Sequence, residues 1–382
     1  MPARGVALFL FYILFFPPTA RTGMVDFSLF FFSNYDVDAN RKYHLLLEAV
    51  RYADKNGFNA VWTPERHFHE FGGLFPNPSV ISAALAMITD RIELRSGSVV
   101  SPLHDAVRIA EEWSVVDNLS KGRVALSFAS GWNGNDFALR KENYQDRHRV
   151  MYEQIELVKK LWQGGSTRRR NGVGREISFK VFPTPRQKEL PVWITAAGNE
   201  HTYRVAGEKG AHLLTHLLGQ NADELAAKIK LYREGRVAGG YPAESGKVAL
   251  MLHTHIGENK DEVMKTVEKP FIDYLRSATG LSKIMYEEAG FKSEDIPEAD
   301  KELMLKHSFL RYSETAALIG TVKSCVPMLR KLKAIGVDEI ACLVDFGIEP
   351  RKVIEGLRHL KALRELAAGA DAREPAQAAL AG

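Results

Sequence analysis

The chain has 382 residues, of which 45% are hydrophobic and 26% are charged, a composition typical of globular proteins. This length suits two average domains or a single α/β barrel. Lysine and arginine number 51 against 47 acidic residues, and so small an excess does not indicate a nucleic-acid partner. The two cysteines, Cys325 and Cys342, are too few for a disulfide framework or a cysteine-rich metal site, and a reducing cytoplasm fits them.

An apolar run occupies positions 6–16, between Arg4 and the Pro17-Pro18 pair. It is too short to cross a bilayer, so no membrane partner is expected, although its basic start and apolar centre match a signal peptide. The first convincing strand opens at Met24. We therefore expect 1–23 to be an apolar extension outside the fold, explained by a start placed too early or by a linker remnant; secretion and a membrane-surface anchor are the alternatives.

Strands and helices alternate from Met24 onward, as hydrophobic periodicity and end signals indicate. In chain order we predict a strand at 25–32, a helix at 40–56, a strand at 58–62, a helix at 78–89, a strand at 92–100, a helix at 106–119, a strand at 124–129 and a helix at 147–162. The alternation resumes with a strand at 191–196, a helix at 200–209, a strand at 211–215, a helix at 222–238, a strand at 248–256, helices at 261–277 and 321–335, a strand at 339–344 and a helix at 350–366.

Two segments interrupt this rhythm. The Gly-, Arg- and Pro-rich stretch 164–188 predicts a hairpin inserted in a loop, and its run 168–170 reads as solvated arginines, with a docking patch for an acidic partner as the rival interpretation. The polar stretch 278–307 predicts a second insertion or a lid. The Ala-, Gly- and Pro-rich end predicts a flexible tail over 368–382.

Eight strands that alternate with helices predict a parallel sheet with crossover connections, and eight is the number that closes a barrel. The predicted fold class is therefore α/β, a (β/α)8 TIM barrel over 24–367 with loop insertions. An open doubly wound sheet is the rival, but it calls for a Gly-rich phosphate loop after the first strand, and 31–35 is not one.

Polar residues follow most of the predicted strands, where a barrel places its ligand site. Taken singly, each of them can cap the following helix, as Asn199 can cap the helix at 200–209. Together they predict a ligand site built from Glu65, Arg66, His67, Ser98, Ser101, Ser130, Gly131, Asp136, Gly198, Asn199, Thr202, His216, His253, His255 and Asp345.

The segment Gly198-Asn199-x-x-Thr202 is the most readable part of this site. A glycine allows close approach of an anion to the backbone, and free amides at a helix start favour negative charge. Arg147, at the start of its own helix, can supply a bidentate partner. These residues predict a phosphate-binding corner.

Metal binding is the competing interpretation, because His67-x-His69 and His253-x-His255 have the same-face spacing of a strand. A catalytic zinc site needs three ligands, and no third ligand is fixed by spacing. We therefore predict no metal. A hydrogen-bonded barrel histidine is the simpler role for His253 or His255.

Four segments are distinctive: 62–73 (WTPERHFHEFGG), 117–123 (DNLSKGR), 127–137 (SFASGWNGNDF) and 191–202 (PVWITAAGNEHT). Through these segments the chain resembles, from about 25 to 366, the bacterial luciferase-like family of flavin-dependent monooxygenases. Segments 62–69, 127–132 and 214–220 (LTHLLGQ) are similar to the subgroup associated with nonribosomal peptide and polyketide assembly lines.

The resemblance implies a barrel that holds reduced FMN, which reacts with O2, while the protein positions the flavin and excludes water. By position, Ala129, Ser130 and Gly131 would lie along the isoalloxazine, with Ser98 and Val99 packed near the ring. Arg147, Gly198, Asn199 and Thr202 would hold the phosphate.

One position departs from the luciferases, in which a histidine base follows the glutamate of this motif. Here that position is Arg66, which stays protonated, so the luciferases' base cannot be carried over and light emission is not expected. Arg66 would instead stabilise an oxygen-derived anion or a substrate carboxylate. His67 is the next candidate for proton transfer. The plainer alternative makes Arg66 a salt-bridge partner of Glu65 or Glu70, and His67 a hydrogen-bonded support.

The expected reaction is hydroxylation of a small or carrier-bound acyl or aminoacyl substrate in natural-product (siderophore, peptide or polyketide) biosynthesis. A separate flavin reductase is the expected partner, with an acyl or peptidyl carrier protein as a second candidate and a homodimer as the candidate assembly. Two alternatives stay open on the same fold. They are a deazaflavin-dependent oxidoreductase that transfers hydride and a catalytically silent, flavin-binding barrel.

Overall fold

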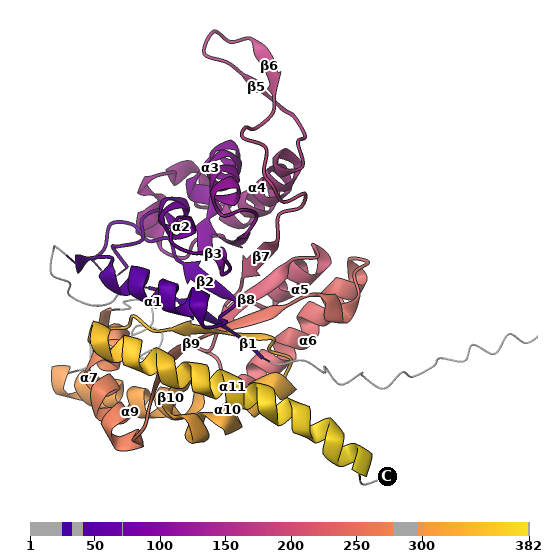
Figure 1. Cartoon of the computed structure of the whole chain (residues 1–382). Coiled ribbons are helices and arrows are strands. Elements are labelled where there is room, and N and C mark those ends of the chain that lie inside the picture. Colours follow the sequence, from indigo (N-terminus) through magenta and orange to yellow (C-terminus); the bar gives the residue numbers. More distant parts are fainter. Residues whose placement is uncertain (1–24, 33–40, 71, 278–296, 381–382) are drawn as a thin grey trace, which may run out of the picture.

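A computed structural model describes residues 25–32, 41–70, 72–277 and 297–380. Its centre is a closed barrel of eight parallel strands (Figure 1), because β9 pairs with β8 on one side and with β11 on the other, and β11 pairs in turn with β1. The barrel strands are β1 (Asp26–Phe30), β2 (Ala60–Thr63), β3 (Glu93–Val100), β4 (Val124–Ala129), β7 (Val192–Thr195), β8 (His212–His216), β9 (Val248–Gly257) and β11 (Glu339–Leu343).

Helices surround the barrel, and most begin at a side chain that satisfies free backbone amides. Asp105 caps its helix by accepting from the amide of Val107, and Asn221 and Glu224 form a capping box. The helices are α1 (His44–Lys55), α2 (Pro78–Ala86), α3 (Ala106–Leu119), α4 (Arg147–Trp162), α5 (Glu200–Glu208), α6 (Ala222–Ala238), α7 (Lys260–Ser277), α9 (Glu298–Thr315), α10 (Val322–Ala334) and α11 (Pro350–Leu380). None of these described helices holds a stretch long and apolar enough to cross a membrane.

The (β/α)8 barrel predicted from the sequence is confirmed, and so is the inserted hairpin. The hairpin consists of antiparallel strands β5 (Thr167–Arg170) and β6 (Glu176–Phe179). It projects away from the barrel beyond α3 and α4 (Figure 1). Arg168, Arg169 and Arg170 are exposed on it, and Arg169 reaches back to Asp105 with an Nη1–Oδ2 distance of 2.5 Å.

The prediction of an irregular region over 278–307 is wrong from residue 298 onward, where α9 begins; 278–296 lies outside the described residues, as does the extension 1–23. A strand that was not predicted, β10 (Ala317–Thr321), follows α9. His253 pairs with both Leu343 of β11 and Ala317 of β10, so β10 lies on the other side of β9 from β11, in line with β8. The last helix continues past the predicted end at 366, and helical backbone occupies 368–380, where a flexible tail was expected.

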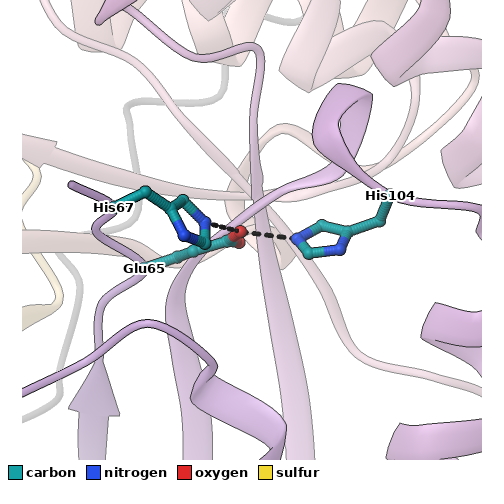
Figure 2. A group of neighbouring side chains, drawn as sticks. All are labelled: Glu65, His67 and His104. Atoms are coloured by element: carbon teal, nitrogen blue, oxygen red, sulfur yellow. Dashed lines mark hydrogen bonds and ion pairs between the residues drawn. The ribbon is translucent and has the colours of Figure 1, made fainter. Parts of the chain in front are cut away.

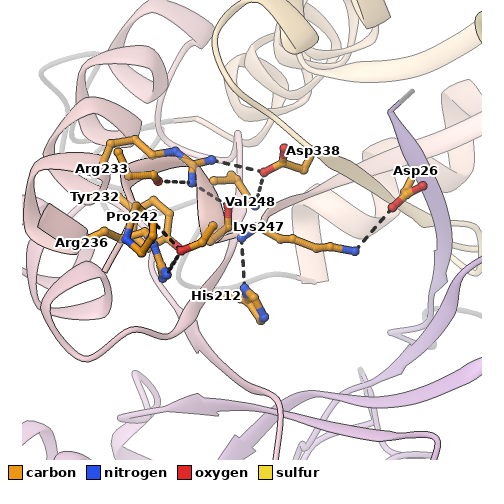
Figure 3. A network of polar contacts seen from close by, with 12 residues as sticks. Asp26, His212, Tyr232, Arg233, Arg236, Pro242, Lys247, Val248 and Asp338 are labelled. Carbon is orange, nitrogen blue, oxygen red and sulfur yellow. Dashed lines mark hydrogen bonds and ion pairs between the residues drawn. The ribbon is translucent and has the colours of Figure 1, made fainter. Parts of the chain in front are cut away.

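Polar contacts tie the strand starts together at one end of the barrel (Figure 3). The Asp338 carboxylate, just before β11, accepts from the amide of Val248 at 2.7 Å and from Arg233 at 3.3 Å. Lys247 pairs with Asp26 of β1 at 3.8 Å, and its amide donates to Nδ1 of His212 at 3.0 Å. In such barrels this end is associated with stability, whereas the opposite end carries the chemistry.

A buried ion pair fills the barrel interior near these strand starts. Nη1 of Arg95 lies 2.9 Å from each carboxylate oxygen of Glu339, and the Arg95 guanidinium also pairs with Glu93. The guanidinium carbon is 4.8 Å from the ring centroids of both Trp62 and Trp193. The guanidinium is thus held by two carboxylates, of which only Glu339 is buried, and by two aromatic faces.

Candidate active site

The loop after β2 places a carboxylate between two imidazoles (Figure 2). Oε1 of Glu65 lies 2.9 Å from Nε2 of His67 and 2.5 Å from Nε2 of His104, which follows β3. Its other oxygen, Oε2, accepts the amide of Val100 at 2.8 Å. The Glu65 side chain has no exposed surface, whereas that of His67 is 12% exposed and that of His104 is 30% exposed. A buried carboxylate thus links an imidazole that is almost covered to one that reaches solvent.

These contacts decide the charge of Glu65. Burial alone would raise the pKa of its carboxyl group, but hydrogen bonds from His104 and His67 outweigh burial and hold the pKa below its usual range. Burial alone would lower the pKa of His104, but its hydrogen bond to the Glu65 carboxylate and the charge of that group raise it. Near neutral pH the group therefore contains an anionic Glu65 and an imidazole with an increased tendency to carry a proton.

Arg66 is buried beside this group, with its guanidinium carbon 4.8 Å from the ring centroid of Trp132. Burial lowers the pKa of Arg66, against the opposing charges of Asp136 and Tyr274, although a guanidinium still stays protonated. Burial also raises the pKa of Asp136, against the opposing charges of Arg66 and His67. The site thus brings a fixed cation, an aromatic face and an acidic group next to His67.

Of the two partners weighed for Arg66, Glu65 is excluded, because the two imidazoles and the Val100 amide take up its carboxylate. The hydrogen bond between His67 and Glu65 is what a structural support requires. The same bond also holds one nitrogen of the ring and leaves Nδ1 for chemistry. Sequence reasoning proposed Arg66 and His67 as site residues, but it missed Glu65 as the hydrogen-bond partner of His67 and missed His104 altogether. The signal for His104 was its place after a strand end, directly before the cap residue Asp105.

The ends of β3, β4 and β7 meet through hydroxyl groups. Ser98 is an extra residue in the β3–β4 register, and its hydroxyl hydrogen-bonds to that of Thr195 on β7. Ser127 of β4 also hydrogen-bonds to Thr195, at 2.7 Å. Ser98 and Val99 are buried, while Ala129 and Ser130 are half-buried where β4 ends. The residues expected along the flavin ring therefore lie on adjacent strand ends, at the same end of the barrel as Glu65.

Arg147 joins the β4 loop to the start of α4. Its Nε donates to the carbonyl of Gly131 at 3.1 Å and its Nη1 to the carbonyl of Tyr144 at 3.1 Å. The guanidinium carbon also lies 4.9 Å from the Tyr144 ring centroid. Among the described residues, no carboxylate forms an ion pair with Arg147. Its position is thus fixed by neutral groups that leave its charge uncompensated.

The start of α5 lies beside the start of α4. Asn199 caps α5 by accepting from the amide of His201 at 2.9 Å, so the capping role considered for it is confirmed. The Thr202 side chain lies near Tyr152 of α4, and burial, followed by the charges of Arg147 and His201, lowers the pKa of His148. A side chain at Gly198 would meet nothing within 4 Å. The residues expected at the phosphate therefore share one corner with positive charge and an open backbone.

Within the described residues, neither of the histidine pairs considered as metal ligands converges with a third donor. His253 packs against Phe271, Tyr274 and Phe346, and burial lowers its pKa to about 3. Its Nε2 has no hydrogen-bond partner among the described residues, so the hydrogen-bonded role proposed for it is wrong at this atom. In the described part of the chain, the three potential metal donors that do converge are Glu65, His67 and His104, and they hydrogen-bond to one another.

Comparisons with known proteins agree with this arrangement. Residues 24–339 match the family described as luciferase-like monooxygenase. The oxygenase component of the flavin-dependent trigonelline monooxygenase of Acinetobacter baylyi is 25% identical over 327 residues, which cover 80% of this chain and 84% of that protein.

Two solved structures share the fold. The oxygenating constituent of 3,6-diketocamphane monooxygenase from Pseudomonas putida, in complex with FMN, superposes with a TM-score of 0.70 at 15% identity, covering 89% of this chain and 97% of its own. An F420-dependent secondary alcohol dehydrogenase superposes with a TM-score of 0.65 at 17% identity, covering 89% and 98%. At these identities both show the fold alone, whereas the family match spans most of the sequence. The resemblance noted in the sequence is thereby confirmed, and the chain belongs to the luciferase-like monooxygenase family.

Proposed function

We propose that the chain is a cytoplasmic, FMN-dependent monooxygenase that uses reduced FMN and O2 to hydroxylate a small or carrier-bound acyl or aminoacyl substrate. The observation that carries this proposal is the Arg147 guanidinium, which two backbone carbonyls hold beside the start of α5. A cation without an acidic partner among the described residues, next to a helix start and a glycine with open space, suits a phosphate group. Segments 62–69, 127–132 and 214–220 support a role in natural-product (siderophore, peptide or polyketide) biosynthesis.

The residues present fit FMN. Arg147, Gly198, Asn199 and Thr202 would hold its phosphate, and Gly198 leaves room for close approach because a Cβ at that position would have no neighbouring atom within 4 Å. The strand-end residues would lie along the ring; they are Ser98, Val99, Ala129, Ser130 and Gly131. Bound in its reduced form, the flavin supplies the reaction with O2.

Arg66 and His67 would act at the reacting edge. Arg66 has a fixed charge and a planar donor fork, and its burial against Trp132 strengthens its hold on an anion, such as a substrate carboxylate. His67 can gain or lose a proton from Nδ1 while Glu65 holds Nε2.

A separate flavin reductase would supply reduced FMN, which the oxygenase-component name of the trigonelline relative supports. Carrier-bound substrate finds support in the projecting hairpin. Residues 164–190 contain seven lysines and arginines against two glutamates. The net charge of this segment, +5, is therefore larger than the +4 of the whole chain. An acidic carrier protein would bind this positive charge. The hairpin contacts Asp105 through Arg169, so the bound carrier would lie close to His104, the residue before Asp105.

A homodimer is supported by exposed apolar side chains at two neighbouring helices, which are Val80 on α2, Met87 directly after α2, and Val115 and Leu119 on α3. Such a patch is costly to leave in water. Sedimentation of the purified protein gives the assembly state, and a monomer at micromolar concentration would remove this part of the proposal.

A deazaflavin-dependent hydride transfer is the second candidate, because an F420-dependent dehydrogenase shares the fold. Absorbance separates the candidates, since FMN gives a band pair that the deazaflavin lacks, and a catalytically silent barrel shows no turnover with either. The decisive experiment supplies FMN, NADH and a flavin reductase under isotopically labelled O2, with carrier-bound acyl groups as substrates. Mass spectrometry should find one labelled oxygen in the product. Product formed without O2 would refute the monooxygenase function.

A further inference from the structure

We propose that Glu65 makes His67 and His104 share one positive charge, so that the protonation of His104, which faces solvent, controls the protonation of His67 inside the barrel. His104 is then a positioning residue that acts on His67 through a carboxylate. The coupling itself is independent of the proposed function, whereas its role in turnover rests on that function.

The geometry gives the two imidazoles one acceptor. Both rings direct Nε2 at Oε1 of Glu65, at 2.9 Å from His67 and 2.5 Å from His104. Figure 2 shows the carboxylate lying between the two rings rather than beside them. The Val100 amide takes the second oxygen, at 2.8 Å. Because the Glu65 side chain has no exposed surface, water cannot compensate its charge, and the two rings must do so.

Electrostatics then favours one added proton over none or two. With both imidazoles neutral, a buried carboxylate is left without a countercharge; with both protonated, two cations share one anion. The state with one cationic and one neutral imidazole is neutral overall and keeps both hydrogen bonds, since a neutral ring can still donate from Nε2. Such a pair titrates as a unit, and each proton binds at the expense of the other.

The neighbours of each ring place this charge on His104. Its Nε2 makes the shorter contact to Glu65, and the carboxylate of Glu112 adds attraction that outweighs the repulsion by Arg140. Its ring is also the more exposed, so its charge is less desolvated.

The carboxylate of Asp136 lies near His67 and attracts positive charge. This attraction is weak because burial raises the pKa of Asp136, and because the Arg66 guanidinium already interacts with the same carboxylate. The single positive charge of the group therefore lies on His104, and the His67 ring presents Nδ1 as a base. A substitution that prevents His104 from carrying this proton leaves Glu65 free to stabilise a cationic His67.

A divalent ion is the competing occupant, because these three groups are a donor set. The hydrogen-bond arrangement disfavours it. The Glu65 oxygen that an ion would need is already shared by both nitrogens, and the other oxygen is bound to an amide.

The test follows the ring signals of His67 and His104 by long-range ¹H–¹⁵N NMR across pH, in flavin-free protein. The variants are His104→Gln, Glu65→Gln and, as control, His44→Gln on α1, where His44 is exposed and pairs with Glu48. His104→Gln retains a donor to Glu65 but cannot titrate. It should move the His67 midpoint up by about one pH unit, a tenfold gain in proton affinity. Glu65→Gln should move both midpoints down, and His44→Gln should move neither.

A His67 midpoint that stays unchanged in His104→Gln, with the fold intact by circular dichroism, would overturn the coupling. So would a stoichiometric divalent metal ion in the purified protein, since ligation removes both titrations. In turnover assays, His104→Gln should shift the pH profile and leave FMN affinity unchanged. Absence of hydroxylation in every protein, wild type included, would instead refute the proposed function and leave the NMR result standing.

Discussion

Arg147 donates from Nε to the carbonyl of Gly131 across a distance of 3.1 Å, which joins the first turn of α4 to the loop after β4. Gly131 has a φ of +82°, and a Cβ there would lie 2.8 Å from Cε2 of Phe137 and 2.9 Å from Cγ1 of Val100. The position of the cation that we assign to the flavin phosphate therefore depends on a glycine that no other residue replaces without strain.

Gly131→Ala should lower the free energy of unfolding by about 1–3 kcal/mol, because it combines an unfavourable φ with overpacking. It should also weaken FMN binding, since the carbonyl that holds Arg147 must move. Urea unfolding and flavin fluorescence measure the two effects. Gly134→Ala is the matched control, because its Cβ would make an ordinary contact at 3.6 Å to Tyr144 without a positive φ. Equal stability of both variants would contradict this account.

Arg147→Ala should weaken FMN binding by about 1.5–3 kcal/mol, the scale of a hydrogen bond to a charged group. Arg149→Ala is the control on the same helix, because Arg149 is exposed and pairs with Asp146 and Glu153. Fluorescence quenching of FMN by the apo-proteins gives both affinities. An Arg147→Ala variant that binds FMN as tightly as Arg149→Ala would remove Arg147 from the phosphate site.

The barrel could be read from the sequence because its signals are local. Apolar strands alternate with capped amphipathic helices, and the predicted bounds of α3, α4 and α6 agree with the structure. The part that failed was α9 and β10. The α9 segment is polar with little one-sided apolar character, and β10 is a five-residue strand whose pairing with β9 is decided by tertiary contact.

The sequence predicts where the candidate site lies, but not which of its residues contact one another. Polar residues at strand ends pointed to Arg66, His67 and the Arg147 corner. The pairing of Glu65 with His104 spans 39 positions and depends on how the loops after β2 and β3 fold over each other. No spacing rule within one segment connects these residues. A histidine that follows a strand by a few positions is also easily assigned to the next helix.

Arg66→Lys should retain FMN binding but divert reduced flavin to hydrogen peroxide. Lysine keeps the charge and loses both the planar fork and the stacking of the guanidinium against Trp132, 4.8 Å from its ring centroid. The ratio of peroxide to hydroxylated product measures this uncoupling, and Arg140→Lys, on an exposed side chain, is the control. If Arg66→Lys keeps the wild-type ratio, Arg66 has a structural role only.

Glu339→Gln should destabilise the fold by about 3–5 kcal/mol, because it leaves the Arg95 guanidinium, buried between Trp62 and Trp193, without its buried counterion. Urea unfolding measures the change. Glu176→Gln on the exposed hairpin removes a pair with Arg168 at 3.6 Å and should change stability by less than about 0.5 kcal/mol. Similar effects of the two substitutions would mean that the buried pair contributes no more than a surface pair.

The Glu65 group should stabilise the fold most at mildly acidic pH. The pKa of Glu65 is lowered in the fold from its ordinary value of 4.5, because hydrogen bonds from His104 and His67 overcome burial. Its contribution is therefore present above pH 4.5 and is lost as the pH falls through the folded pKa. The pKa of His104 is raised from 6.5, because Glu65 overcomes burial, so its contribution is complete below pH 6.5 and is lost as the pH rises through the folded pKa.

Both contributions coexist between these two ordinary values. The difference in unfolding free energy between wild type and Glu65→Gln should therefore be largest between pH 4.5 and 6.5 and shrink on either side. Taking the difference removes the acid destabilisation from the buried neutral histidines, among them His216, whose pKa burial lowers to about 4. Urea unfolding of both proteins across this range makes the comparison. A difference that stays constant from acid to alkaline pH would show that folding does not shift the pKa values of Glu65 and His104 through their contact.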